Sequence, residues 1–252
     1  MRLAAIILTY NEEAHITACV ESVRFADTVI VFDSFSTDHT VKLAQAAGAT
    51  VMQNRFEDYA RQRNAALQAV TGQVDWVLFV DADERVTPEL AQEARQKIDL
   101  AGYSGWRIPR ENYMFGHRTR GGGWFPDYQT RLLKVGEAHF DPERRVHEVT
   151  VLKQACGTLD HPFIHYNYQD IAQFHKKQRA YSAYDAQILF EQGIRPKPQN
   201  YVLQPLRQFW WRFVTLRGYI DGLHGLHMGL LMARYELRKY RLLRGLWQKK
   251  VT

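Results

Sequence analysis

The chain has 252 residues, of which 46% are hydrophobic and 24% charged, a composition typical of a globular protein with a substantial core. Its two cysteines, Cys19 and Cys156, are too few and too far apart for a disulfide framework or a zinc cluster, which favours a reducing compartment. Polar groups arrive too early in the first residues for a signal peptide, and no window of about 18–20 uncharged apolar residues predicts a membrane-spanning helix.

The first 100 residues alternate between short apolar runs and helical stretches, which is the pattern of βαβ units around a parallel sheet. It predicts strands at 3–8, 28–32, 50–53 and 76–80, and helices at about 11–24, 38–47, 56–70 and 87–100. Asn11 is the expected cap of the first helix. Thr87 followed by Pro88 is a strong start for the fourth helix.

The pattern changes after residue 100. Strands are predicted at 105–109, 129–135 and 149–153, between long polar loops, as a continuation of the same sheet. From Asp170 onward the chain is expected to be helical, with a linker containing two prolines at residues 195–198. We therefore expect one α/β domain over residues 1–195 and a helical tail over residues 196–252.

The positive charge of the chain is concentrated in the tail. Residues 200–252 contain ten Lys and Arg residues against two acidic residues, whereas the net charge of the whole chain is +6. Aromatic and aliphatic residues alternate with these cations, as in an interfacial helix that meets an anionic membrane. The alternative is that the aromatic stripe packs on the rest of the protein. We expect no nucleic-acid partner, because the tail has no recognition motif and the rest of the chain is slightly acidic.

Acidic residues follow two of the predicted strands. Asp81 and Asp83 come directly after the apolar strand at 76–80, and residues two apart in an extended segment project to the same side. Ligands of open α/β sheets bind at the carboxyl ends of strands, where two carboxylates suit Mg²⁺ or Mn²⁺ bound to a diphosphate. Two solvated turn carboxylates are the alternative. Asp33, after the strand at 28–32, can accept hydrogen bonds from a ribose hydroxyl or a base N–H, and Asp38 can cap the next helix.

Four ordered segments resemble the family 2 glycosyltransferases with the GT-A fold: residues 6–13 (IILTYNEE), 33–38 (DSFSTD), 63–66 (RNAA) and 78–84 (LFVDADE). The resemblance implies an α/β fold with a Rossmann-like, mostly parallel sheet and, for this chain, a C-terminal helical extension. It implies that the donor is a nucleotide diphosphate sugar, a UDP-hexose being the expected one. Residues 1–100 would then form the nucleotide-sugar-binding half of the catalytic domain, and residues 101–195 the acceptor-side half.

The same resemblance assigns roles to individual residues. Thr9, Tyr10 and Glu12 would line the nucleotide pocket, and Asp33 would read the base or the ribose. Arg63 would approach the base and the phosphates. Asp81 would lie near the ribose and the metal, and Asp83 would be the direct ligand of Mn²⁺ or Mg²⁺.

Three later segments, 124–133 (WFPDYQTRLL), 146–148 (VHE) and 165–168 (HYNY), are similar to the bacterial lipopolysaccharide-core β-glucosyltransferases. This implies a glycan or lipid-linked acceptor in cell-envelope synthesis, at the cytoplasmic face of the cell membrane, and a contact of His165 with the metal or the diphosphate. Inverting transfer, which the larger family implies, needs a carboxylate base for the acceptor hydroxyl. Glu148 and Asp127 are the candidates. We favour Glu148, which follows cationic residues in a polar loop, although an exposed carboxylate paired with Arg145 fits equally well.

Two further expectations complete the sequence analysis. Three glycines at 121–123, flanked by arginines and Trp124, predict a mobile loop that closes over the donor, or a simple surface turn. The rival functions are a nucleotidyltransferase and a non-catalytic, membrane-associated binding module. A nucleotidyltransferase normally begins with a glycine-rich basic loop, which Thr9 to Glu12 do not provide.

Overall fold

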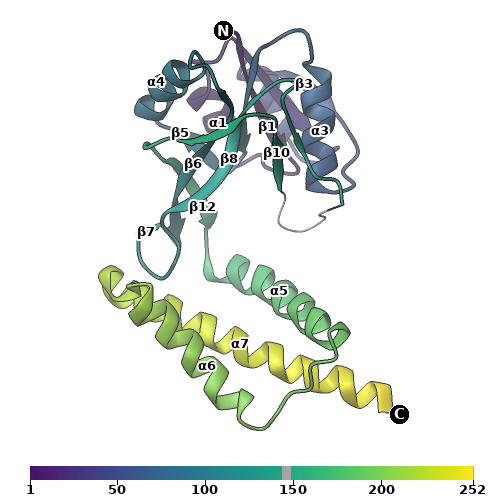
Figure 1. Cartoon of the computed structure of the whole chain (residues 1–252), viewed down its shortest axis with the longest axis vertical. Coiled ribbons are helices and arrows are strands. Elements are labelled where there is room, and N and C mark those ends of the chain that lie inside the picture. The colour runs from purple at the N-terminus through teal and green to yellow at the C-terminus, as the bar shows by residue number, and fades with distance from the viewer. Residues whose placement is uncertain (144–148, 252) are drawn as a thin grey trace. The chain divides into compact units, whose positions relative to one another are not determined.

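The computed structural model describes residues 1–143 and 149–251 and divides into two compact units. The first unit contains Met1–Arg110 and Tyr128–His165, and the second contains Glu111–Asp127 and Tyr166–Thr252. Figure 1 shows the strands and the short helices of the first unit, and the three long helices of the second. Glu148, the favoured candidate for the catalytic base, lies outside the described residues.

The first four strands form the parallel half of a mixed sheet. They are β1 (Leu3–Thr9), β2 (Thr28–Asp33), β3 (Thr50–Gln53) and β4 (Trp76–Asp81), in the order β3-β2-β1-β4. The strand order continues through β8 (Asp127–Lys134), β6 (Tyr103–Met114), β12 (Phe163–Tyr168) and β5 (Glu84–Val86). β8 runs antiparallel to β4, and β12 antiparallel to β5. The short strands β7 (His117–Thr119) and β11 (Ala155–Thr158) pair with β6, while β9 (Ala138–Phe140) and β10 (Thr150–Leu152) form a separate ribbon.

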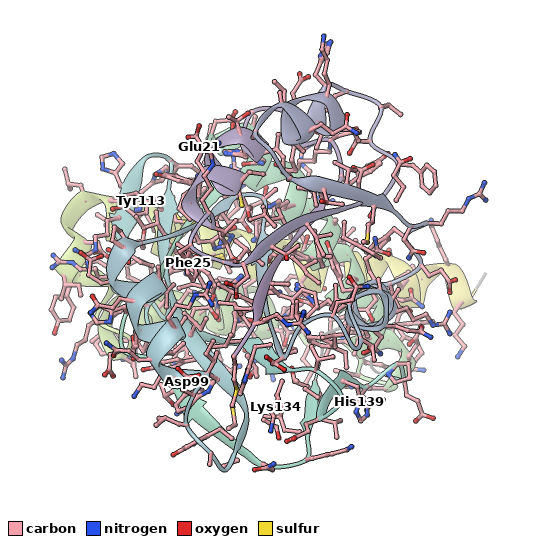
Figure 2. All side chains as sticks on the ribbon, turned by 90° about the horizontal axis from the view of Figure 1, so that it is seen from above. Glu21, Phe25, Asp99, Tyr113, Lys134 and His139 are labelled. Carbon is pink, nitrogen blue, oxygen red and sulfur yellow. The ribbon has the colours of Figure 1, made fainter. Side chains whose placement is uncertain are left out.

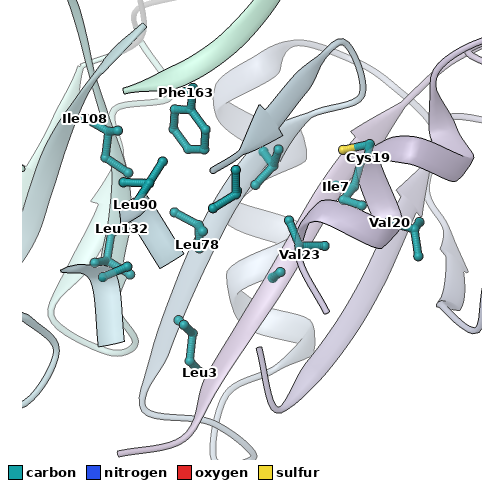
Figure 3. Close-up of a cluster of buried hydrophobic side chains, with 14 of the residues drawn as sticks. Leu3, Ile7, Cys19, Val20, Val23, Leu78, Leu90, Ile108, Leu132 and Phe163 are labelled. Atoms are coloured by element: carbon teal, nitrogen blue, oxygen red, sulfur yellow. The ribbon is translucent and has the colours of Figure 1, made fainter. Parts of the chain in front are cut away.

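Alternation along these strands produces a core on each face of the sheet. Leu3, Ile7 and Leu78 point to the face covered by α1 (Ile16–Ser22), α2 (Thr40–Ala46) and α4 (Pro88–Lys97), as the close-up of that cluster shows in part (Figure 3). Phe25, labelled in Figure 2, packs against the same cluster. The intervening residues, among them Ile6 and Phe79, face α3 (Tyr59–Ala69) and the β9–β10 ribbon. Because both faces are buried, these strands are continuous apolar runs in the sequence.

The helix starts differ in how well the sequence predicted them. Thr87 accepts a hydrogen bond from the Leu90 amide at 3.2 Å and Pro88 is the first residue of α4, which confirms that prediction. The prediction for Asn11 is wrong, because α1 begins only at Ile16 with no side-chain cap. Asn11 instead has a positive φ of 55° and accepts a hydrogen bond from the Thr37 amide at 2.8 Å, which joins two loops.

The second unit is built around the helices α5 (Ile171–Glu191), α6 (Asn200–Trp210) and α7 (Gly222–Val251), with a π-helical turn at Trp211–Thr215 and a 3₁₀ turn at Gly218–Asp221. Phe174 of α5 and Tyr235 of α7 pack together with Met114 at the end of β6. α5 therefore belongs with the tail helices, although the sequence analysis placed the boundary after residue 195. None of the helices described is both long enough and apolar enough to cross a bilayer. The predicted fold, a mostly parallel α/β sheet with a C-terminal helical extension, is confirmed.

Candidate functional site

The ends of β1, β2 and β4 bring three of the predicted site residues to one edge of the sheet. In the strand register, Thr9 lies opposite Asp33 and Leu8 lies opposite Asp81. This is the carboxyl edge of parallel strands, the position at which open α/β sheets bind ligands. The apolar strands thus fix Thr9 and Asp33 at the same level, and Asp81 one residue away along the neighbouring strand.

Asp33 is completely buried and holds the turn that follows β2. Its carboxylate accepts hydrogen bonds from the Ser36 amide at 3.0 Å, from Gln53 Nε2 at 3.0 Å and from Thr9 Oγ1 at 3.2 Å. The Ser36 hydroxyl donates a further hydrogen bond to it. These partners order the loop that would face a nucleotide, so Asp33 shapes the edge of the site through the backbone of residues 33–36.

Two aromatic rings extend from this edge towards solvent. Tyr10, directly after β1, is 59% exposed, and Phe35, within the turn that Asp33 holds, is 49% exposed. Phe35 has a φ of 61°, a left-handed conformation that bulky residues rarely adopt. The Asn11 amide donates to Ser36 Oγ at 2.9 Å and the Glu12 amide donates to Thr40 Oγ1 at 2.8 Å, so the two loops are joined to each other. The predicted pocket residues Tyr10 and Glu12 therefore lie on a well-ordered pair of loops.

Asp81 is held by two buried arginines from different elements. Arg63 of α3 donates from Nη2 to Asp81 Oδ1 at 3.2 Å, and Arg131 of β8 donates from Nη2 to Asp81 Oδ2 at 2.6 Å. Burial would raise the pKa of Asp81, but Arg131, Arg63 and Arg110 outweigh it and hold that pKa well below its usual range. Arg63 is also packed between the rings of Phe79 and Phe140, with centroids at 5.4 and 5.6 Å. Asp81 is therefore a fixed anion at the end of β4.

Glu84, the first residue of β5, is hydrogen-bonded to the turn that follows β4. The Asp81 amide donates to Glu84 Oε2 at 2.9 Å, and Arg110 Nη1 lies 3.5 Å from Glu84 Oε1. Burial and the negative charge of Asp81 raise the pKa of Glu84, against the opposing effect of Arg131 and Arg110. Arg63, Arg110 and Arg131 thus surround the carboxylates of Asp81 and Glu84 at this edge of the sheet.

Asp83 lies in the turn between β4 and β5, and its surroundings differ from those of Asp81. The strand ends at Asp81, so the prediction that the two carboxylates lie on one extended segment is wrong. Asp83 Oδ2 lies 3.5 Å from Nε2 of His165, which β12 places opposite Glu84 in the strand register. His165 is 7% exposed. The turn therefore separates an arginine-bound Asp81 from an Asp83 that faces an imidazole, and both carboxylates are half-buried.

Asp83 and His165 together fit a divalent cation. A carboxylate oxygen and an imidazole nitrogen are both ligands that Mn²⁺ accepts, and in the part of the chain that the structure describes Asp83 pairs with His165 and with no arginine. No cluster of three or more His, Cys, Asp or Glu side chains is arranged for a metal ion within residues 1–143 and 149–251. The protein would therefore supply few ligands, and oxygens of a bound diphosphate could complete the coordination.

The remaining predicted residues lie elsewhere. Asp127 is the first residue of β8 and belongs to the second compact unit. Sequence reasoning overlooked Arg110 and Arg131 as site residues. Arg131 lies within the segment 124–133 that resembles the lipopolysaccharide-core enzymes, so a signal for it was present. His161, the other histidine near β12, is bound through Nδ1 by Glu93 of α4 at 2.8 Å.

The three glycines at 121–123, predicted to form a loop over the donor, are hydrogen-bonded to the tail within the second unit. The Gly122 amide donates to the Leu216 carbonyl at 2.8 Å, and Arg212 Nη1 donates to the Gly122 carbonyl at 2.8 Å. Asp221 accepts the Gly121 amide at 2.7 Å. A side chain at Gly121 would collide with the backbone of Arg217, so the glycines allow close backbone packing.

The chain is similar in sequence to known glycosyltransferases. A lipopolysaccharide core biosynthesis glycosyltransferase, LpsC of Rhizobium meliloti, is 27% identical over 95% of this chain and 93% of its own length. An uncharacterized glycosyltransferase of Rickettsia bellii is 28% identical over 97% of this chain and 87% of its own. Among solved structures, glucosyl-3-phosphoglycerate synthase of Mycobacterium tuberculosis, in complex with Mn²⁺, UDP and glucosyl-3-phosphoglycerate, is 22% identical over 45% of this chain, with a TM-score of 0.37. The chain spans 44% of the length of that solved structure.

The family model for "Glycosyl transferase family 2" matches residues 4–146, which is more than half of the chain. The match begins in β1 and includes Asp33, Arg63, Asp81, Asp83 and Arg131, and it supports the predicted GT-A fold. The chain therefore belongs to glycosyl transferase family 2.

Proposed function

We propose that this glycosyltransferase is an inverting, metal-dependent hexosyltransferase that uses a UDP-hexose donor. The observation that carries the proposal is the contrast at the end of β4, where Asp81 is bound by Arg63 and Arg131 while Asp83 faces His165. The cationic cluster suits an anionic nucleotide, and the Asp83–His165 pair suits the cation that accompanies its diphosphate.

Each residue of the edge has a part in this proposal. Tyr10 and Phe35 offer exposed rings to the base, and Thr9 and Asp33 order the loops that carry them. Asp81, held at one position by its arginines, accepts hydrogen bonds from the ribose. Arg63 and Arg131 add positive charge near the phosphates. The nucleotide-sugar-binding half over residues 1–100 would thus contain most of the donor contacts.

Asp83 and His165 would hold Mn²⁺ or Mg²⁺, which when bound offsets the charge on the leaving diphosphate. In an inverting transfer the acceptor oxygen bonds to the anomeric carbon as the bond from that carbon to the diphosphate oxygen breaks. A carboxylate must take the proton of the acceptor hydroxyl in the same step. Asp127 and Glu148 remain the candidates, both within the proposed acceptor-side half at residues 101–195.

The acceptor is proposed to be a lipid-linked or lipopolysaccharide-type glycan at the cytoplasmic face of the cell membrane. The similarity to LpsC, a lipopolysaccharide core biosynthesis enzyme, supports this class of acceptor. The ten cations of residues 200–252 support contact of the tail with an anionic membrane.

The test is thermal unfolding of the protein with UDP-glucose and other nucleotide diphosphate sugars, with and without Mn²⁺, for the wild type, Asp83→Asn and Asp99→Asn. A ligand at about 100 times its Kd stabilises the folded form by about 2.7 kcal/mol. For a chain of this size that raises the Tm by roughly 5–10 °C. Asp83→Asn should lose the Mn²⁺-dependent part of the shift and sugar transfer while keeping the Tm of the unliganded protein.

Asp99 is the matched control, since its exposed carboxylate only meets the N-terminal ammonium at 3.3 Å. Asp99→Asn should behave as the wild type in both assays. If no nucleotide diphosphate sugar shifts the Tm of the wild type, the donor proposal fails. If a shift occurs but is the same with and without Mn²⁺, the metal proposal fails and the donor proposal stands.

A further inference from the structure

The helix α6 carries a row of large apolar side chains that are more than half exposed in the described part of its unit. No residue of α6 is buried. Leu203, Leu206 and Trp210 are spaced at three and four residues and are 58%, 59% and 63% exposed. This spacing places them on one face of a helix. The row continues with Val214 in the π-helical turn, which is 36% exposed. Leu223, in the first turn of α7, is exposed as well, at 84%.

The contacts that hold α6 in place use a different set of side chains. Phe209 and Phe213 stack on each other with ring centroids 5.3 Å apart. The ring of Phe209 also lies against Gly229 of α7, where an added Cβ would be only 3.2 Å away. The packing of α6 on α7, which run side by side in Figure 1, is therefore satisfied without the outer row. An exposed apolar row that the fold does not need indicates a binding surface.

The charges around this row favour an anionic partner. Lys197, Arg207 and Arg217 are all exposed beside it. Between residues 192 and 235 the sequence contains one acidic residue, Asp221. Its carboxylate accepts hydrogen bonds from the backbone amides of Arg120 and Gly121, so it is already engaged within the second unit.

We infer that the outer row of α6, defined as Leu203, Leu206, Trp210 and Val214, inserts into the surface of an anionic lipid bilayer. A tryptophan and leucines on one side, bordered by cations, match the boundary between acyl chains and anionic headgroups. A second copy of the chain fits less well, because two such faces would bring like charges together. The inference rests on the proposed function in one respect, that the acceptor glycan is met at the membrane surface. Vesicle binding itself requires no catalysis and can be tested separately.

The experiment is co-sedimentation of the full chain with vesicles of phosphatidylglycerol and phosphatidylcholine, compared with vesicles of phosphatidylcholine alone. The variants are Leu206→Glu and Trp210→Glu, with Tyr184→Glu as the matched control. Tyr184 is 50% exposed on α5, so the control places the same charge on a comparably exposed aromatic position of the same unit. Circular dichroism and the Tm shift with UDP-glucose and Mn²⁺ are measured for every variant.

We expect binding to the anionic vesicles that weakens with added salt and is much lower for phosphatidylcholine alone. Leu206→Glu and Trp210→Glu should each weaken vesicle binding by about tenfold or more, because a charge replaces an apolar side chain that the bilayer would bury. Tyr184→Glu should leave vesicle binding unchanged. Absence of binding by the wild type, equal binding by all variants, or a wild-type dimer that Trp210→Glu dissociates would overturn the inference. Vesicle binding without any nucleotide-induced Tm shift would instead contradict the proposed function alone.

Discussion

Two glycines of α7 provide a paired test of how tightly the tail is packed. At Gly225 an added Cβ would overlap the carbonyl oxygen of Gly218 and lie 2.8 Å from the carbonyl carbon of the same residue. These are backbone atoms, which no rotamer change can move aside. At Gly245, in the same helix, nothing lies within 4 Å of the added Cβ. The two positions share a helical backbone and differ in their surroundings.

The expected effects of Gly225→Ala and Gly245→Ala are opposite in sign. Alanine stabilises an exposed helix interior by up to about 1 kcal/mol relative to glycine, and this gain applies to both positions. At Gly225 the overlap adds a cost of about 1–3 kcal/mol or more, typical of overpacking. The two variants should therefore differ by roughly 1–3 kcal/mol in the stability of the second unit, which for a chain of this size corresponds to roughly 2–12 °C in Tm.

The assay is thermal and denaturant unfolding followed by the helical circular dichroism signal, to which α5, α6 and α7 contribute most of the helical residues. Gly245→Ala should unfold at or above the wild-type temperature and Gly225→Ala below it. Equal midpoints for the two variants would refute the reasoning, because intrinsic helix propensity would then account for both and the contact with Gly218 would be without consequence.

Three other predictions follow from the described contacts. Arg131→Met removes one of the two arginines that bind Asp81 and should destabilise the protein by about 3 kcal/mol at pH 7. Folding lowers the pKa of Asp81, so the difference in denaturant midpoint between variant and wild type should shrink as pH falls below about 4. Burial, with His117 nearby, lowers the pKa of His224, so the Tm should fall as pH decreases through about 6.5, and less steeply in His224→Gln. Cys156 is exposed whereas burial raises the pKa of Cys19, so a thiol reagent should modify one cysteine of the native protein, and none in Cys156→Ser.

The parts of the fold that the sequence predicted are those with strong local signals. The strands β1 to β4 are buried on both faces, so their apolar runs were unambiguous, and Thr87 with Pro88 marked the start of α4. The strands that were missed, β5, β7, β9, β11 and β12, are short or polar, and three of them have only three residues. Their existence depends on pairing partners distant in sequence, such as β12 with β5.

In the candidate site, too, the residues with a local sequence signal were predicted and those that depend on distant partners were missed. Asp81 was placed correctly at the end of a strand, because the carboxyl end of an apolar run can be read locally. Its partner Arg131 lies 50 residues further along the chain, and no periodic pattern relates the two. The turn at residues 82–83, which separates Asp81 from Asp83, is likewise set by the hydrogen bond from the Asp81 amide to Glu84.

The second unit is assembled from two stretches of chain, because Met114, in 111–127, packs with Met228 and Tyr235 of α7. During synthesis, residues 111–127 leave the ribosome about a hundred residues before those partners do. Tyr168 and Phe174 of the same core emerge earlier, but the contacts of Met114 with α7 can form only after most of the polypeptide has emerged. A chain truncated before Met228 would lack Met228, Leu231 and Tyr235 of this core, so α7 cannot be removed as a separate module without exposing Met114.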